Sequence, residues 1–452
     1  MTQPTHFSPE TEHALDLIAA TTQREGRVPG LAAAIARKGQ IRWFRGIGSA
    51  DLAHPGVTPD ADTQYPVASN TKLFTAVVIM ALRDEGRLDL DDPISRHLPG
   101  IAHGHVTIRQ LLSHISGMQR EPVGEVWRTL EMPDADALVS GWAEASQVGR
   151  PHHHWHYSNL GYAMLGQVIE RLDGQPWFTS VKRRILDPLG LTRTTLGPAG
   201  RRATGYHVPP WTDVPVPEPD LDLRATAPAG ALASTASDLA TWGGFIANPS
   251  AEILHPDTLE EMLVPQTMAD PATWSQAWGL GFMLVRREDR LWVGHTGGFP
   301  GAVTGFLTER ASATTSIVLM NTSSPGLAQG PALVSAKLGT VAVEREPVVP
   351  EPWIPGTDVP APAAEILGHW WSEGSEFVFS VREGRLEARA IGAPATTPPS
   401  VFTLEAEDTW RTVSGREAGE LLLVRRDPAG AVSEMSWATY PFTREPAPFG
   451  PA

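Results

Sequence analysis

A proline-rich stretch near residue 350 constrains the fold more than any other feature of this sequence. Residues 347–362 contain six prolines and lie within the segment EREPVVPEPWIPGTDVPAPAAE. Proline lacks a backbone N–H and fixes φ, so neither a helix nor an inner strand can continue through such a segment. The sequence therefore predicts a linker over residues 346–363, which separates a domain at 1–345 from a smaller domain at 364–452.

Composition and charge exclude several classes of protein. Hydrophobic residues make up 41% of the 452 residues, which is enough for a sizeable core. The formal net charge is −15, and no long basic run occurs. Nucleic-acid binding needs a positive patch, so we expect no nucleic-acid partner. The chain has no cysteine, which excludes disulfides, thiol nucleophiles and cysteine-based metal sites.

The sequence also bears on location. The N-terminal residues do not show a basic segment followed by an apolar one, so we expect no signal peptide. No run of about 18 apolar residues occurs, so we expect no membrane span. The lack of cysteine fits a reducing compartment. We therefore predict a cytoplasmic protein without a membrane partner.

Periodicity predicts a mixed α/β first domain. A helix is expected over 9–26, then a hairpin over 31–51 that turns at Lys38-Gly39-Gln40. Helical spacing recurs over 69–86, 107–113, 134–146, 159–172, 236–247, 256–264 and 328–340. Two strand pairs are expected, at 279–286 with 290–295 and at 302–309 with 314–320. The strands at both ends of this region should share one sheet.

Alternating apolar and polar residues predict an all-β second domain. Segments such as EFVFSVREGRLEARA and GELLLVRRDPAGAVSEMSW alternate with period two and are separated by Glu-Gly and Pro-Ala-Gly turns. A small antiparallel barrel fits this pattern. Its tryptophans have two interpretations, barrel core or an apolar wall near a substrate; the candidates are Trp370, Trp371, Trp410 and Trp437.

The first candidate site residues are Ser69 and Lys72, at the start of an apolar helical segment. A serine hydroxyl is a poor nucleophile unless a base accepts its proton. Residues i and i+3 share one helix face, so the amine of Lys72 should lie beside Ser69. Burial would lower the pKa of that amine and let it act as the base. The same pattern also fits an N-capping serine with a surface lysine.

Two further segments add polar groups of the same kind. Tyr157 and Asn159 stand immediately before and at the start of a predicted helix, where Tyr157 can relay a proton; near a cationic Lys72 its charged form would be favoured. His295-Thr296-Gly297-Gly298 follows a predicted strand, and its glycines allow another backbone to approach closely. A helix cap and a glycine-rich strand end remain the structural alternatives.

A cluster of histidines at His152, His153, His154 and His156 suggests a metal site at first sight. Consecutive residues do not project to one side, and no carboxylate completes a ligand set. We expect these histidines to line the mouth of a pocket, and we expect no metal and no cofactor.

Taken together in this order, the motifs resemble the penicillin-binding-protein and class C β-lactamase superfamily. Its signatures are Ser-x-x-Lys, Tyr-x-Asn and a Lys/His-Thr/Ser-Gly strand. Family-like stretches at 107–117, 187–191 and 228–235 extend the resemblance over about residues 10–340. It implies a β-lactamase/transpeptidase-like α/β (α+β) fold, with an antiparallel sheet flanked by helices, an all-helical subdomain and a lipocalin-like barrel after it.

The resemblance also implies roles. Ser69 would be acylated, Lys72 and Tyr157 would act as base and acid, and Asn159 would bond the lysine or the substrate amide. The backbone N–H groups of Ser69 and Gly298, beside Gly297, would form the oxyanion hole. His295 departs from the lysine of β-lactamases and is largely neutral at pH 7, which points to esterases, D-aminopeptidases and thioesterases.

The two-domain layout is similar to penicillin-binding-protein-type thioesterases of nonribosomal peptide synthesis. That group implies a peptidyl thioester on a carrier protein as substrate, a peptidyl carrier protein as partner, and head-to-tail macrocyclisation. One alternative is a cytoplasmic esterase or D-aminopeptidase acting on a small acyl or peptide substrate. Another is a non-catalytic binding protein on the same fold. Because we expect no export signal, cell-wall peptide is a poor candidate substrate.

Overall fold

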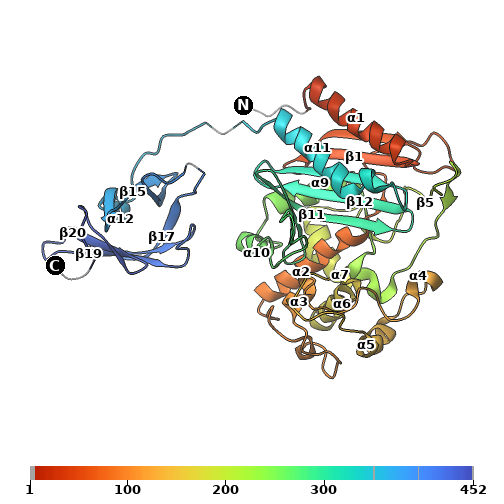
Figure 1. Cartoon of the computed structure of the whole chain (residues 1–452), viewed down its shortest axis with the longest axis horizontal. Coiled ribbons are helices and arrows are strands. Elements are labelled where there is room, and N and C mark those ends of the chain that lie inside the picture. Colours follow the sequence, from red (N-terminus) through yellow and green to blue (C-terminus); the bar gives the residue numbers. More distant parts are fainter. Residues whose placement is uncertain (1–5, 350–351, 395, 450–452) are drawn as a thin grey trace. The chain divides into compact units, whose positions relative to one another are not determined.

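The computed structural model describes residues 6–349, 352–394 and 396–449. It divides into two compact units, Met1–Val348 and Val349–Ala452, whose elements are shown in Figure 1. The division falls inside the predicted linker, although that segment contains a short helix, α12 (Ala361–Ala364).

An eight-stranded antiparallel sheet forms the centre of the first unit, in the order β2-β1-β13-β12-β11-β10-β9-β8. Strands from both ends of the unit's sequence are therefore neighbours, which confirms the predicted shared sheet. The strands are β1 (Gly30–Arg37), β2 (Gln40–Gly48), β8 (Thr267–Met268), β9 (Gln276–Trp278), β10 (Met283–Arg287), β11 (Arg290–Phe299), β12 (Ala302–Glu309) and β13 (Thr314–Met320).

Side chains alternate across this sheet and bury both of its faces. In β1, Leu31, Ala33 and Ile35 join the apolar cluster formed with α1 (Pro9–Glu25) and α11 (Pro331–Arg345). Ala32, Ala34 and Ala36 belong to the larger cluster on the other face, which includes α9 (Ala236–Ala247). Period-two alternation in a strand buried on both faces explains why β1 reads as an almost uninterrupted apolar run.

A mostly helical region packs against the second face of the sheet and appears below it in Figure 1. Its helices begin at side-chain caps: Thr107 and Gln110 form a capping box, and Ser158 accepts from the N–H of Gly161. The helices here and beside α9 are α2 (Thr71–Asp84), α3 (Ile108–Leu112), α4 (Val126–Thr129), α5 (Ala135–Glu144), α6 (Asn159–Asp173), α7 (Trp177–Val181), α8 (Asp187–Leu189) and α10 (Pro256–Met262).

Short elements connect these layers. They are β3 (Tyr65–Pro66), β4 (Thr195–Leu196), β5 (Tyr206–His207), β6 (Val216–Pro217) and β7 (Leu232–Ser234), with the tight helical turns η1 (Ala68–Asn70), η2 (Ile94–Arg96), η3 (Lys182–Leu186), η4 (Arg224–Ala229) and η5 (Leu327–Gln329). Strands β3, β7 and β4 form a small sheet beside η1 and η4.

Some predicted boundaries differ from the structure. The strand expected at 279–286 is shorter: β10 covers 283–287, and residues 279–282 form a bend after β9 that includes Gly281 with φ of +92°. The helix expected at 328–340 runs over 331–345, because Pro331 occupies its first turn, where a missing N–H costs nothing.

The second unit is a nearly closed barrel of eight antiparallel strands in sequential order. A bridge between Trp371 and Thr443 joins the first strand to the residue after the last one. Trp370, Trp410 and Trp437 lie in the barrel core, so the core interpretation is right for them. The strands are β14 (Gly368–Ser372), β15 (Ser375–Arg382), β16 (Arg385–Ala390), β17 (Ser400–Ala406), β18 (Thr409–Thr412), β19 (Leu421–Arg426), β20 (Val432–Trp437) and β21 (Tyr440–Phe442).

Within the described parts of the chain, none of the helices has the length and apolar character needed to cross a membrane.

Candidate functional site

Ser69 lies in the turn η1, here called the serine turn, which leads directly into α2. The preceding residue, Ala68, has φ of +48°, a left-handed conformation that costs energy for a residue with a Cβ. The side chain of Asn70 holds the turn by donating to the carbonyl of Val67 at 3.0 Å and to Oγ1 of Thr304 at 2.8 Å. Ser69 itself stays partly exposed.

Lys72 is fully buried one turn after Ser69, as the i, i+3 spacing predicts. Its Nζ lies 3.2 Å from Oγ of Ser69, and it donates to Oδ1 of Asn159 at 2.8 Å and to the carbonyl of Ala229 at 2.6 Å. Burial lowers the pKa of this amine well below its usual value, although the nearby Glu121 carboxylate opposes the shift.

The carbonyl of Ala229 reaches Lys72 because η4 packs tightly against α6. A Cβ on Gly166 of α6 would lie 2.1 Å from Cγ of Pro228, so the close approach requires glycine there. The family-like stretch at 228–235 contains Ala229, but nothing in the sequence indicated that its carbonyl binds the lysine.

Tyr157 faces the same space from the segment before α6. The Nζ of Lys72 lies 4.9 Å from the centre of its ring. Burial raises the pKa of Tyr157 well above its usual value, and a hydrogen bond with Ser69 opposes that rise. The expectation that a cationic lysine favours the charged phenol is therefore wrong, because desolvation acts on both groups and favours a neutral amine beside a neutral phenol.

His114 supports Tyr157 and was not identified as a site residue from the sequence. It is fully buried, and its ring centre lies 4.3 Å from that of Tyr157. Its Nδ1 accepts from the backbone N–H of Ser158 at 3.1 Å. Burial lowers the pKa of His114 well below its usual value. The ring is thus a neutral packing surface for the phenol.

Asn159 joins the lysine to a carboxylate. Its Oδ1 accepts from Lys72, while its Nδ2 donates to Oε1 of Glu121 at 2.7 Å. The backbone N–H of Asn159 donates to the carbonyl of Arg120 at 2.7 Å, which fixes the start of α6. Arg120 also pairs with Glu121 at 3.3 Å. Glu121 was missed because no motif spacing marks it.

His295 is 2% exposed and lies across the site from Lys72. Its Nδ1 donates to the backbone carbonyl of Thr296, and its Nε2 has no hydrogen-bond partner among the described residues. Burial lowers the pKa of His295 to about 3. The expectation of a neutral imidazole at pH 7 agrees with this environment. The ring packs edge-on against Trp278 at 5.3 Å.

Gly297 brings strand β11 against the serine turn. A Cβ there would lie 2.4 Å from the carbonyl oxygen of Val67 and 3.0 Å from Cβ of Ala68. Gly298 is different, since a Cβ there would meet nothing within 4 Å. The motif was expected to follow a strand ending at 295, but β11 continues to Phe299, so both glycines are strand residues.

A cleft of about 760 Å³ opens over these groups, and its lining includes Ser69, Tyr157, Asn159, His295 and Gly298. Trp155, Trp278 and Trp127 supply apolar surface to it. A narrow slot of about 40 Å³ also reaches Ser69, Glu121 and Gly298 from the side of η4. The Ser69 hydroxyl is thus accessible from two directions and lies next to the desolvated amine of Lys72. This arrangement is suited to acyl transfer.

The histidine cluster contributes little to this cleft. His156 lines it, whereas His152, His153 and His154 are exposed and are not among its lining residues. Among the described residues, no group of three or more histidine or acidic side chains is arranged to hold a metal ion.

Comparison with curated proteins gives relatives of moderate similarity. Protein flp of Staphylococcus aureus (strain N315) is 29% identical over 255 residues, 54% of this chain and 51% of the relative. Beta-lactamase-like protein 2 of Dictyostelium discoideum is 26% identical over 318 residues, 66% of this chain and 56% of the relative. The chain thus spans about half the length of the curated relatives it matches.

Solved structures resemble both units. SurE has a TM-score of 0.60 at 25% identity, covering 96% of this chain and 99% of SurE. The octameric penicillin-binding protein homologue from Pyrococcus abyssi has a TM-score of 0.63 at 20% identity, and the match covers 96% of this chain and 99% of the homologue. D-amino acid amidase from Ochrobactrum anthropi has a TM-score of 0.64 at 24% identity, and the match covers 74% of this chain and 99% of the amidase. At these lower identities, the last two show the fold alone.

Family models assign the two units separately. A domain of unknown function (DUF7586) matches residues 359–444 in the barrel. The beta-lactamase model matches residues 15–337, which is more than half of the chain and includes every residue of the candidate site. The chain therefore belongs to the beta-lactamase family.

Proposed function

We propose that this protein is a serine acyltransferase in which Ser69 is acylated and Lys72 is the base. The observation that carries this proposal is the bonding of Lys72. A neutral amine has two N–H groups, and two carbonyl oxygens, from Ala229 and Asn159, lie 2.6 and 2.8 Å from Nζ. The nitrogen lone pair is then left for the hydroxyl proton of Ser69, 3.2 Å away.

The acylation step follows from this geometry. Oγ of Ser69 attacks the carbonyl carbon of the donor while its proton passes to Nζ of Lys72. The negative charge on the carbonyl oxygen is held by the backbone N–H groups of Ser69 and Gly298. The leaving group departs with a proton relayed through the Tyr157 hydroxyl, and an ester on Ser69 remains.

For the donor and acceptor, we propose a peptidyl thioester and the peptide's own terminal amine. The amine attacks the ester, its proton returns through Tyr157 and Lys72, and the hydroxyl of Ser69 is released with a head-to-tail macrocycle. The two-unit layout supports this proposal, since it resembles penicillin-binding-protein-type thioesterases. SurE, which aligns over both units, has also been solved with D-Leu, so we propose a D-residue at the acylating position.

The cleft offers two further features that favour an amine over water as the acceptor. Trp155 and Trp278 cover the site with apolar surface, which disfavours free access of water to the ester. The carboxylate of Glu121 lines both the cleft and the slot, where it can accept a hydrogen bond from the terminal amine and hold it close to the acyl carbon.

A linear peptide thioester ending in a D-residue tests this function directly. The purified full chain is incubated with it and the products are weighed. Loss of the thiol without gain of water shows macrocyclisation, whereas the free acid shows hydrolysis and supports an esterase or D-aminopeptidase instead. The matching thioester with an L-residue at its end is the control for stereochemistry.

Covalent labelling, together with the turnover measurement, separates an enzyme from a binding protein. A fluorophosphonate should add covalently to Ser69, and the adduct should be absent from Ser69→Ala. If the folded wild-type chain shows neither turnover nor adduct, the acyl-enzyme proposal is wrong and a non-catalytic binding protein is favoured.

A further inference from the structure

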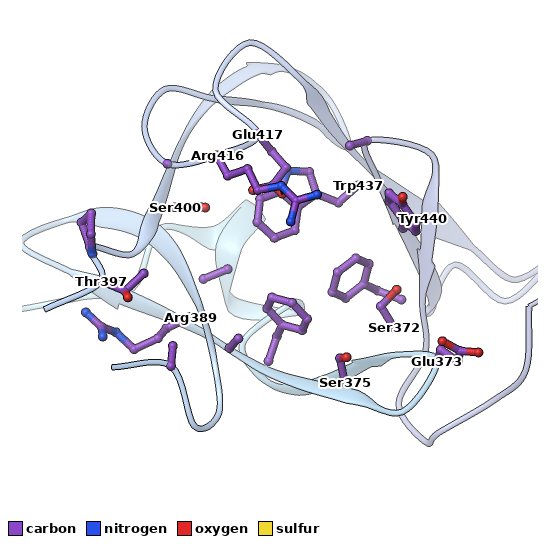
Figure 2. Close-up of a pocket in the computed structure, with 18 of the residues that line it drawn as sticks. Ser372, Glu373, Ser375, Arg389, Thr397, Ser400, Arg416, Glu417, Trp437 and Tyr440 are labelled. Carbon is purple, nitrogen blue, oxygen red and sulfur yellow. The ribbon is translucent and has the colours of Figure 1, made fainter. Parts of the chain in front are cut away.

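The barrel of the second unit contains a cavity of its own, of about 770 Å³. Its walls come entirely from residues 372–449, so it is distinct from the cleft over Ser69. Figure 2 shows this cavity, with Trp437 above, Ser375 below and Tyr440 at one side. Ligand pockets of small molecules usually have volumes of this order.

The cavity exists because inward-facing side chains differ between the two ends of the barrel. At one end, Trp370, Phe379 and Leu386 are buried in a packed core. Toward the other end, the inward positions of the neighbouring strands carry small residues, and Ser372, Ala388, Ala390 and Ser400 line the cavity. Since strand residues alternate between faces, these small side chains leave the space unfilled.

The cavity has one strongly apolar wall. Phe377, Trp437 and Phe442 line it, and their ring centres are 5.2 to 6.2 Å apart. Tyr440 and Phe449, whose rings lie 6.0 Å apart, extend this surface to the rim and are about half exposed. Exposed aromatic surface of this kind favours an apolar, flat or branched ligand body.

The remaining wall carries polar groups that the described residues do not use. The hydroxyls of Ser372, Ser375 and Ser400 line the cavity, and in the described part of the chain none of them has a side-chain hydrogen bond. The Nε1 of Trp437 is in contrast satisfied by Oγ1 of Thr412 at 2.9 Å. The free hydroxyls can therefore bond a ligand without breaking existing contacts.

The cavity lining includes two arginines, Arg389 and Arg416, and two glutamates, Glu373 and Glu417. Arg389 bonds the carbonyl of Pro394 at 3.4 Å, and no carboxylate of the described residues pairs with it. Arg416 pairs through Nε with Glu417 at 3.5 Å, and Figure 2 shows its guanidinium extended over the cavity. In the same view the side chains of Glu373 and Arg389 both extend away from the centre of the cavity, so Arg416 is the cation that reaches over it. Guanidinium groups suit a carboxylate.

We propose that the barrel binds an amphipathic carboxylate, with its apolar body on the Phe377–Trp437–Phe442 wall and its carboxylate at Arg416. This site lies outside the proposed acyl-transfer chemistry and does not depend on it. Loss of binding here should leave the acylation of Ser69 intact, so the failure of one proposal is distinguishable from the failure of the other.

Binding to the full chain is measured with 8-anilinonaphthalene-1-sulfonate, a fluorescent aromatic sulfonate. Ala390→Phe fills the cavity from an inward position and should raise the dissociation constant at least about tenfold. Ala431→Phe adds the same ring at an exposed turn that does not line the cavity, and should bind as the wild type does. Wild-type affinity in a folded Ala390→Phe chain overturns the site.

A second variant protects the test against misfolding. Ser375→Leu fills the exposed rim rather than the inner wall and should also weaken binding. Near-ultraviolet circular dichroism and labelling of Ser69 by a fluorophosphonate verify that each variant is folded. If both cavity variants are folded and still bind the dye normally, the dye binds elsewhere and the proposal is wrong.

Competition between the dye and charged amphiphiles tests which ligand charge the cavity prefers. Decanoate should displace the dye, and decyltrimethylammonium, with the same chain length, should do so at least about tenfold more weakly. Arg416→Gln should remove this difference, and Arg389→Gln should leave it. Arg385→Gln, on the same strand but outside the cavity lining, is the control. Equal displacement by both amphiphiles, or stronger displacement by the cation, would contradict carboxylate recognition.

Discussion

The amine of Lys72 donates to the carbonyl of Ala229 at 2.6 Å, across 157 residues of sequence. This contact uses one of the two N–H groups of the neutral amine, and Asn159 uses the other. The position of the proposed base is therefore set by η4 and α6, which lie outside its own helix. The predictions below test what this arrangement does.

Ser69→Ala should abolish turnover, because the attacking oxygen is lost. We expect kcat to fall by roughly a thousandfold or more, with the free energy of unfolding changed by less than about 1 kcal/mol. Steady-state kinetics and urea denaturation check the two parts. A near-normal rate in this variant would remove Ser69 from the chemistry.

Lys72 should make the stability depend on pH. Its pKa is lowered in the folded state, so between that value and the unfolded value near 10.4 the unfolded chain binds more protons, and wild-type stability rises with pH. Lys72→Met lacks this ionisation. From about pH 7 to about pH 9, the free energy of unfolding of the wild type should rise relative to that of the variant, by at most about 1.4 kcal/mol per pH unit. Denaturant unfolding at several pH values measures it; a constant difference would contradict the lowered pKa.

His295 should act as a neutral group. Its folded pKa is about 3, below the usual histidine value of 6.5, so the unfolded chain binds more protons between these values. Stability should therefore fall as pH falls through this window, and His295→Gln should reduce the dependence. His295→Ala should lower the rate of acylation roughly a hundredfold, more than it lowers stability. Unchanged single-turnover kinetics in the alanine variant would place His295 outside the reaction.

The two neighbouring glycines should respond in opposite ways to the same change. Gly297→Ala would place Cβ 2.4 Å from the carbonyl oxygen of Val67 and should cost roughly 1–3 kcal/mol and displace the serine turn. Gly298→Ala meets nothing within 4 Å and should leave stability within about 0.5 kcal/mol of wild type. Thermal denaturation of both variants is the measurement. Similar losses from both would contradict the close packing of β11 on the serine turn.

Local patterns in the sequence were enough to place much of the fold and of the site. Ser69 and Lys72 are one turn apart, so their contact follows from helix geometry alone. The hairpin turn at Lys38-Gly39 was also predictable, and both residues have positive φ, 50° and 78°.

Contacts between distant segments were not predictable in the same way. His114 contacts Tyr157 because the segment after α3 packs against the start of α6, and no sequence periodicity encodes that packing. The charge state of Tyr157 was mispredicted for a related reason: a sequence shows which groups are neighbours in a motif, but desolvation depends on everything that surrounds them.

The bond from Asn70 to Thr304 spans 234 residues, and this distance has a consequence for synthesis on the ribosome. A nascent chain that has passed α2 already carries the serine and the lysine, yet the strand that clamps their turn has not been translated. Until β12 emerges and pairs, Ser69 remains an ordinary hydroxyl. The proposed reactivity of Ser69 therefore develops only after nearly the whole first unit has left the ribosome.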